Sequence, residues 1–123
     1  MSERIYGDHE ESKRPLVWMH GEVRTPPMSS RARAQFGILL RQLQSGESLG
    51  MPQSRPMPSV GARCHELRVA DGRVSWRLVC RLDRDAVIIL DVFGKRTAET
   101  PHPVLEACRE RLRRYDSVAG DER

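Results

Sequence analysis

The stretch that decides the fold contains three apolar segments: Cys64–Ala70 (CHELRVA), Val74–Leu82 (VSWRLVCRL) and Ala86–Phe93 (AVIILDVF). The first two alternate polar and apolar side chains, which is typical of strands with one buried face. The third is apolar on both sides apart from Asp91, so we expect it to be a central strand covered on both faces. The order of the three segments predicts a small sheet.

The connections between these segments are short. Asp71-Gly72 joins the first two, and glycine accepts the positive φ that tight hairpin turns require. Asp83-Arg84-Asp85 joins the second and third. We therefore predict three consecutive antiparallel strands.

A strand and a helix are predicted before the three segments. Pro15–Val23 holds a short apolar cluster and is expected to form a strand. Apolar residues recur at helical spacing within Arg31–Ser45, and Ser29 or Ser30 can cap that helix by accepting hydrogen bonds from its first amides. We expect this helix to pack on one face of the sheet.

A loop and a second helix complete the predicted fold. Gly46–Arg63 is rich in glycine and proline and is expected to be a surface loop. Thr100-Pro101 has the signature of a helix start, and the helix is expected over Val104–Tyr115, near the other face of the sheet or its edge. The predicted fold class is α+β, with a mostly antiparallel four-stranded sheet in the order β-α-β-β-β-α.

The length and composition indicate one domain. The 123 residues, 38% hydrophobic and 31% charged, suffice for one modest core. We expect residues 1–14 to be a flexible lead-in, residues 15–116 the single domain and residues 117–123 a frayed tail. No apolar run approaches the roughly 20 residues of a membrane span, and no signal peptide is evident. A cytoplasmic protein without a membrane partner is therefore expected.

Cysteine and histidine residues form no metal or nucleophile motif. The three cysteines include no close pair, which predicts reduced, buried thiols. The four histidines lack ligand spacing. Cys64 and His65 are neighbours on a strand, so their side chains point to opposite faces. We therefore predict no bound metal.

Positive charge is concentrated in the strand-rich half of the chain. Residues 55–114 contain 13 Lys and Arg against 8 Asp and Glu, a net charge of +5, while the whole chain carries +4. This distribution suggests an anionic partner, with nucleic acid as the first candidate. The alternative is a basic surface that serves only solubility.

Several of these cations are predicted to meet. Arg77 and Arg81 are four residues apart on one strand and share a face, and Arg68 on the paired strand can lie beside Arg77. Lys95 and Arg96 follow the third strand. Such a cluster is typical of a phosphate site, because the cations repel one another unless an anion neutralises them. We expect Arg77 and Arg96 to serve the site and not the core.

The other arginines have a simpler expected role. Arg81 is expected to pair with Asp83 or Asp85. The arginines between residues 109 and 114 are expected to face solvent.

The same segments resemble the RelE/ParE superfamily of bacterial toxins. The resemblance rests on Trp76-Arg77-Leu78-Val79, Glu66-Leu67-Arg68 and Gly94-Lys95-Arg96. Similarity to the phage-derived HigB-like subfamily rests on Leu16-Val17-Trp18, Arg63–Arg68 and Val92–Thr97 with Thr100-Pro101. It extends over roughly residues 15–115.

The resemblance implies the toxin of a type II toxin–antitoxin pair. Such a toxin is an endoribonuclease that cuts messenger RNA, usually on the ribosome, with the RNA's own 2′-hydroxyl as nucleophile and without a metal or other cofactor. It implies a cognate antitoxin, here a helix-turn-helix HigA-like protein that forms a hetero-oligomer with the toxin. Two alternatives stay open: a ParE-like inhibitor of DNA gyrase without catalysis, and an inactive phage-derived binding module.

The resemblance also implies roles for individual residues. The candidate catalytic residues are Arg77, Lys95, Arg96 and His102, and the candidate substrate-binding residues are Arg68 and Phe93. Arg77 and Arg96 would brace the scissile phosphate. His102 falls where RelE has a catalytic tyrosine, and its imidazole could donate a proton to the leaving 5′-oxygen; the alternative is an exposed residue in the first turn of a helix. The sequence identifies no general base.

Overall fold

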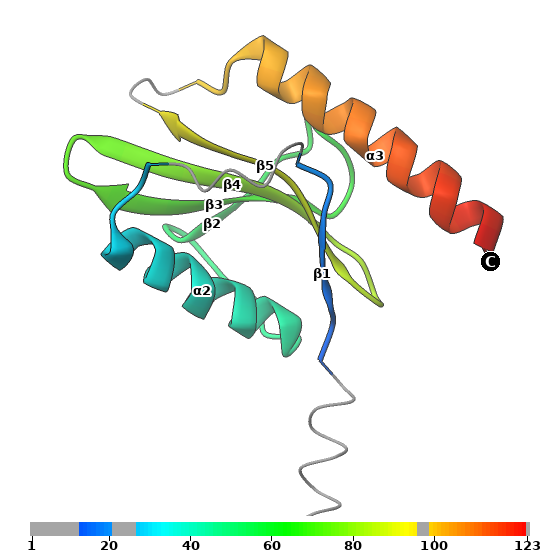
Figure 1. Ribbon diagram of the computed structural model, residues 1–123, viewed down its shortest axis with the longest axis horizontal. Coiled ribbons are helices and arrows are strands. Elements are labelled where there is room, and N and C mark those ends of the chain that lie inside the picture. The colour runs from blue at the N-terminus through cyan, green and yellow to red at the C-terminus, as the bar shows by residue number, and fades with distance from the viewer. Residues whose placement is uncertain (1–12, 21–26, 96–98, 123) are drawn as a thin grey trace, which may run out of the picture.

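The computed structural model describes residues 13–20, 27–95 and 99–122. Its elements are β1 (Leu16–Trp18), α2 (Ser30–Gln44), β2 (Ser54–Pro56), β3 (Cys64–Asp71), β4 (Val74–Leu82), β5 (Val87–Lys95) and α3 (His102–Glu122). The strands form one five-stranded sheet in the order β1-β5-β4-β3-β2. α2 lies on one side of this sheet and α3 on the other (Figure 1), as predicted. Neither of these two described helices has the length and hydropathy of a membrane span.

The antiparallel hairpins of the sheet are confirmed. β3 pairs with β4, and the register sets Arg68 directly opposite Arg77. Gly72 has a φ of 64° in the turn between them, a conformation that glycine adopts without steric cost. β4 pairs with β5 in turn. The predicted three-stranded centre of the fold is therefore present.

β5 is a central strand, as its apolar sequence predicted. It lies between β4 and β1, and Val87–Leu90 is fully buried. β1 pairs with β5 in parallel, with Leu16 opposite Val87. The sheet is therefore mixed, and the long connection through α2 and the β3–β4 hairpin allows this parallel pairing.

A fifth strand corrects the predicted four-stranded sheet. β2 lies inside the segment predicted to be a loop and pairs antiparallel with β3, with Arg55 opposite Glu66. Three residues are too few to show an alternating pattern, and Pro56 argues against a central strand. Because β2 is at the edge of the sheet, Pro56 is tolerated there.

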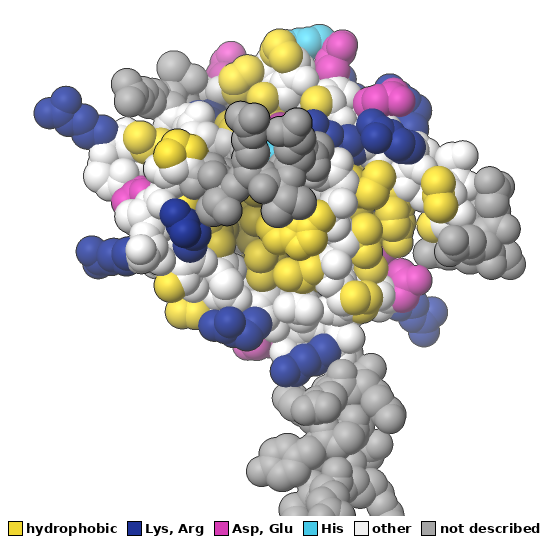
Figure 2. All heavy atoms as spheres, in the orientation of Figure 1, with side chains coloured by type: hydrophobic (Ala, Val, Ile, Leu, Met, Phe, Trp, Pro, Cys, Tyr) yellow, Lys and Arg dark blue, Asp and Glu magenta, His cyan; other side chains and the backbone are white. Residues whose placement is uncertain are grey.

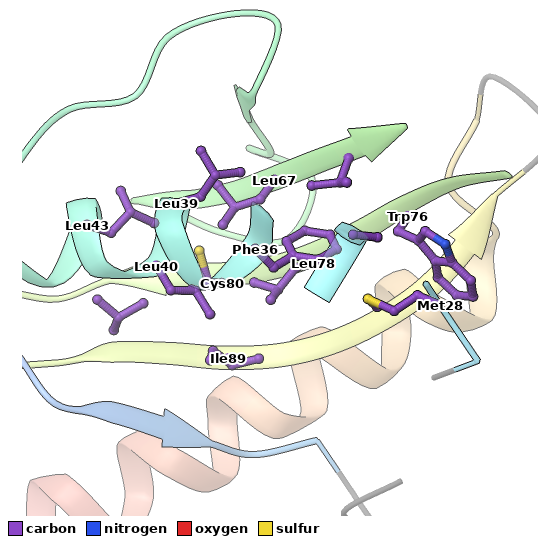
Figure 3. Packing of buried hydrophobic residues seen from close by; sticks show 13 residues of the cluster. Met28, Phe36, Leu39, Leu40, Leu43, Leu67, Trp76, Leu78, Cys80 and Ile89 are labelled. Carbon is purple, nitrogen blue, oxygen red and sulfur yellow. The ribbon is translucent and has the colours of Figure 1, made fainter. Parts of the chain in front are cut away.

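The core between α2 and the sheet follows the predicted helical stripe. Ser29 caps the helix, with its Oγ accepting a hydrogen bond from the Ala32 amide at 3.1 Å. Gly46 follows the C-terminal end with a φ of 86°, a conformation that favours glycine. Figure 3 shows the helix residues against the sheet; the residues labelled there are Met28, Phe36, Leu39, Leu40, Leu43, Leu67, Trp76, Leu78, Cys80 and Ile89.

A second core joins α3 to the opposite face. Cys108 and Leu112 of the helix pack with Val79, Ile88 and Leu90. α3 begins at His102 and continues to Glu122, so the residues predicted to fray are helical as far as residue 122. Residues 1–12 of the predicted lead-in lie outside the described ranges.

The three cysteines are free and buried, as predicted. Burial raises the pKa of Cys64 to about 11 and the pKa of both Cys80 and Cys108 to about 12. Thiols with such pKa values are protonated and poorly nucleophilic at neutral pH. They belong to the two cores and supply no chemistry.

Candidate functional site

The face of the molecule shown in Figure 2 carries no single basic patch among its described residues. On the face shown in Figure 2, Lys and Arg side chains are dispersed around a central hydrophobic area. One group of contacts stands out, on the α3 side of the sheet beyond the apolar core.

A buried ion pair forms the centre of this group. Glu66 of β3 is fully buried, and its Oε1 accepts a hydrogen bond from Nη1 of Arg77 at 2.5 Å. Nε of Arg77 donates to Oγ of Ser75 at 2.9 Å. Arg77 is only 5% exposed. The expectation that Arg77 is dispensable for the core is therefore wrong, because it neutralises a buried carboxylate.

Lys95 joins Glu66 through a threonine hydroxyl. Its Nζ donates to Oγ1 of Thr100 at 3.2 Å, and this hydroxyl donates to Oε2 of Glu66 at 3.2 Å. Lys95 is buried at the end of β5. Thr100, which immediately precedes the helix start, is thereby tied back to the middle of β3.

An irregularity between β4 and β5 sets the direction of Lys95. Cys80 lies opposite Ile89 but Val79 lies opposite Asp91, so Leu90 is an extra residue in β5. Past this bulge the alternation of side chains is reversed, and Lys95 lies opposite Ser75 on the face that carries Arg77. Without the bulge, Lys95 would point toward α2.

Gly94 is needed next to Lys95. A Cβ at this position would come within 3.1 Å of the side chains of both Trp76 and Val74. Glycine therefore lets β5 pass close to the Trp76 ring before it reaches Lys95.

Two further arginines border the ion pair. Nε of Arg68 lies 3.9 Å from Oε1 of Glu66, and the Arg68 side chain is 28% exposed. Arg55 of β2 is opposite Glu66 in the sheet and is also half-buried. We call the set of Arg55, Glu66, Arg68, Arg77, Lys95 and Thr100 the Glu66 cluster.

The Glu66 cluster carries an excess of positive charge. It contains four cations and one carboxylate. Burial lowers the pKa of Lys95 from its ordinary value, and the charges of Arg77, Arg55 and Arg68 lower it further, while Glu66 opposes them. The predicted convergence of Arg68, Arg77 and Lys95 is present, but an internal anion neutralises part of it.

A comparison with known protein families assigns the chain to one of them. Residues 27–113 match the family described as phage-derived protein Gp49-like. The chain belongs to this family. It is a family of RelE-like toxins, and membership is compatible with a role in a toxin–antitoxin system. Comparisons with curated proteins and with solved structures returned no match.

Two further predicted site residues of this Gp49-like protein, His102 and Phe93, are described, and neither belongs to the hydrogen bonds described around Glu66. His102 is 74% exposed at the start of α3, and its Nδ1 lies 3.7 Å from Oε1 of Glu106. Within the described residues, it takes no part in the hydrogen bonds around Glu66. Phe93 lies opposite Arg77 in the sheet, half-buried against the α3 core. Arg96 lies outside the described residues.

The expectations for the other arginines hold only in part. Arg81 pairs with Asp83 as predicted, at 2.7 Å, and also with Asp116. Arg113 and Arg114 are exposed. Arg111 is not, because its Nη1 donates to the carbonyl of Leu90 at 2.6 Å.

Sequence reasoning missed three members of the Glu66 cluster. Glu66 occupies a polar-face position in an alternating strand, where an exposed side chain is the ordinary expectation. Arg55 was placed in a loop because β2 is so short, and Thr100 was read as part of a helix start. Glu66 could have been predicted from the cations themselves, because neighbouring cations repel one another unless an anion lies among them, and Glu66 is the nearby carboxylate on the same strand as Arg68. In the ranges that the structure describes, no group of three His, Cys, Asp or Glu side chains is placed to hold a metal ion.

Proposed function

We propose that this Gp49-like protein is the toxin of a type II toxin–antitoxin pair and a HigB-like, metal-independent endoribonuclease that cuts ribosome-bound messenger RNA. The observation that carries the proposal is the charge of the Glu66 cluster, where four cations surround one carboxylate. An RNA phosphate is an anion that such an excess attracts. Membership of a RelE-like toxin family supports the same reading.

The free donors of the cluster suit a phosphate in the transition state. Within the described residues, the guanidinium groups of Arg55 and Arg68 donate no hydrogen bond, and Arg77 uses Nε and Nη1 but not Nη2. These donors can bind the oxygens on which charge increases as the 2′-hydroxyl attacks the phosphorus. Donors already held in position stabilise that charge more than water does.

Glu66 is assigned a positioning role. Its Oε1 accepts from Arg77 and its Oε2 accepts from Thr100, and the side chain is fully buried. A carboxylate whose two oxygens both accept hydrogen bonds, one of them from a guanidinium, is not available to take the proton of the 2′-hydroxyl as a general base. It holds the Arg77 guanidinium in one orientation, which keeps the phosphate donors in place.

Proton donation to the leaving 5′-oxygen is assigned to Lys95. An ammonium with a lowered pKa gives up its proton more readily at neutral pH than an ordinary lysine. His102, the earlier candidate, is exposed and has Glu106 beside it. We retain His102→Ala as the comparison variant that separates the two assignments.

The test of the function is primer extension on a translated message after induction of the protein. The wild type is expected to produce cuts that follow the reading frame and to arrest growth. The double variant Arg55→Ala/Arg68→Ala should lose both effects. The matched control Arg41→Ala/Arg114→Ala removes the same charge from exposed positions and should behave as the wild type. Growth arrest by the wild type without any cleavage would contradict the nuclease.

The alternative function is a ParE-like inhibitor of DNA gyrase. The burial of Arg77 against Glu66 favours this alternative. If the ion pair only stabilises the fold, Arg77 has no catalytic role, as expected of an inhibitor that performs no cleavage. A supercoiling assay with purified gyrase separates the two functions. Inhibition of supercoiling without message cleavage would establish the inhibitor, and an absence of both would favour an inactive phage-derived binding module.

The proposed partner is an antitoxin of the helix-turn-helix HigA type with an acidic segment over or beside the cluster. Such a segment would neutralise the excess charge that the Glu66 cluster retains. Its affinity should therefore decrease as ionic strength rises. Calorimetric titration from low to high salt measures this, and an affinity independent of salt would contradict a charge-dominated interface.

A further inference from the structure

An open groove of about 550 Å³ lies beside the Glu66 cluster. It is bounded by the first turns of α2, by the residues before β2 and by the end of β3. Arg31 and Gln35 line it from α2, Gln53 from the segment before β2, and Arg68 from β3. Arg68 therefore belongs both to the groove and to the Glu66 cluster.

The shortness of β2 opens this groove at the edge of the sheet. β2 pairs with β3 only as far as Leu67, and the Arg68 amide donates to the Gln53 carbonyl at 2.9 Å just beyond it. Among the described strands, none pairs with the following residues of β3 on that edge. A chain leaving the α3 side of the sheet can pass around this edge toward α2.

The polar groups of the groove suit a polynucleotide backbone. Arg31 is exposed and, within the described residues, makes no ion pair or hydrogen bond. Asp71 is the acidic residue of the groove, and its two oxygens already accept hydrogen bonds from Ser29 and Trp76. These bonds lower the pKa of Asp71, and the charge of Arg31 contributes as well. The carboxylate is thus held at the helix cap, and the Arg31 guanidinium is left to bind another anion.

We propose that this groove binds the single-stranded RNA that flanks the scissile phosphate, with Arg31 holding a backbone phosphate and Gln35 and Gln53 contacting base edges. The inference rests on the proposed nuclease function. Arg68 links the two sites, since it contacts the phosphate region of the Glu66 cluster and also lines the groove. Glutamine amides offer both donors and acceptors, which unpaired bases can use.

Fluorescence anisotropy with two 2′-O-methyl oligoribonucleotides, which lack the attacking hydroxyl, tests the groove. One probe is a dinucleotide and the other is about eight nucleotides long, within the range that one single-strand site covers. The wild type should bind the longer probe more tightly. Arg31→Ala should weaken the longer probe about tenfold and leave the dinucleotide unchanged. It should also reduce the salt slope for the longer probe by about 0.7, the value for one phosphate contact on a single strand.

Two variants control the measurement. Arg41→Ala removes an exposed charge from the same helix outside the groove and should bind both probes as the wild type does. Arg68→Ala should weaken both probes, because Arg68 serves both sites. Equal affinity of the wild type for the two probes, or equal behaviour of Arg31→Ala and Arg41→Ala, would overturn the groove as an RNA subsite. An Arg31→Ala effect on antitoxin affinity alone would assign the groove to that protein and would also overturn the proposal.

The groove and the nuclease can fail separately. Message cleavage by the wild type with no advantage for the longer probe would refute only the groove. A preserved advantage for the longer probe with no cleavage of any message would refute the nuclease and leave an RNA-binding groove.

Discussion

Arg77 and Arg81 lie on the same face of β4, and both are buried, but their surroundings differ in charge. Around Arg81 the ion pairs match in number: Arg81 and Arg63 pair with Asp83 and Asp116, and Arg14 donates to the backbone carbonyl of Asp83. The Arg81 guanidinium also lies 5.8 Å from the centre of the Tyr115 ring. The cluster around Arg77 holds four cations, Arg77 among them, and one carboxylate.

The difference separates a structural network from a site. Both Asp83 oxygens and both Asp116 oxygens accept from Arg81, so each of its three guanidinium nitrogens already donates to a carboxylate. These bonds raise the pKa of Arg81, which keeps its charge permanent. The Glu66 cluster retains unused donors within the described residues. A buried arginine is therefore informative about function only when its partners have been counted.

The largest effect is expected for Glu66→Ala. This variant leaves the Arg77 guanidinium buried without its counterion, which should lower the free energy of unfolding by roughly 3–5 kcal/mol. Urea denaturation measures the loss. The double variant Glu66→Leu/Arg77→Met replaces the pair by apolar side chains and should recover much of the stability but none of the cleavage. If the free energy of unfolding of Glu66→Ala lay within about 0.5 kcal/mol of that of the wild type, the Glu66–Arg77 pair would not be buried in solution.

Lys95→Arg tests the proton donor. Replacing the ammonium by a guanidinium keeps the charge but prevents proton donation, and should slow cleavage on the order of 10²-fold. In the wild type, kcat/KM should fall as pH rises through the pKa of Lys95, because the protonated form is needed. That fall should come below the ordinary lysine range, since the pKa is lowered. If kcat/KM of Lys95→Arg showed the same decrease with pH, Lys95 would not be the proton donor. A decrease in cleavage rate for His102→Ala as large as that for Lys95→Arg would also contradict the assignment to Lys95.

Arg68→Ala tests the guanidinium donors of the Glu66 cluster that make no hydrogen bond within the described residues. Loss of one donor to the phosphate should slow cleavage by about 10²-fold, the lower end for a preorganised donor, because Arg68 is partly exposed. Its urea midpoint should stay close to that of the wild type. Cleavage at the wild-type rate in this folded variant would mean that Arg68 does not contact the phosphate.

Arg81→Ala should give the opposite pattern. Removing its hydrogen bonds to Asp83 and Asp116 should cost about 2 kcal/mol of stability, and the cleavage rate per folded molecule should not change. Denaturation curves and message cleavage are measured on the same preparations. A loss of cleavage without a loss of stability would place Arg81 in the site and erase the contrast with Arg77.

The smallest effect is expected for Asp116→Ala. Asp116 is 56% exposed, so its pairing with Arg81 is screened by solvent and should contribute only about 0.5 kcal/mol. The shift of the urea midpoint at constant slope measures it. A loss as large as that of Arg81→Ala would show that the outer half of this network is as important as Asp83.

Much of the architecture was predictable because its signals are local. The Asp71-Gly72 turn, the Ser29 cap and the apolar stripe of α2 each depend on residues close together in the chain, and all three are present. The central position of β5 followed from its apolar faces. β2 escaped prediction because three residues carry no periodicity, and its pairing with β3 depends on the tertiary fold.

The sequence by itself determined the helices, the antiparallel hairpins, the buried thiols and the neighbouring positions of Arg68 and Arg77. Only the tertiary structure decided which cations have partners. Glu66 and Thr100 meet across 34 positions of sequence, and the bulge at Leu90 turns Lys95 to the face of Arg77. Alternation assigns a side chain to a face of the sheet, but the charge of a site depends on contacts between distant segments. That is why Arg77 and Arg81, equivalent by spacing, differ in the folded protein.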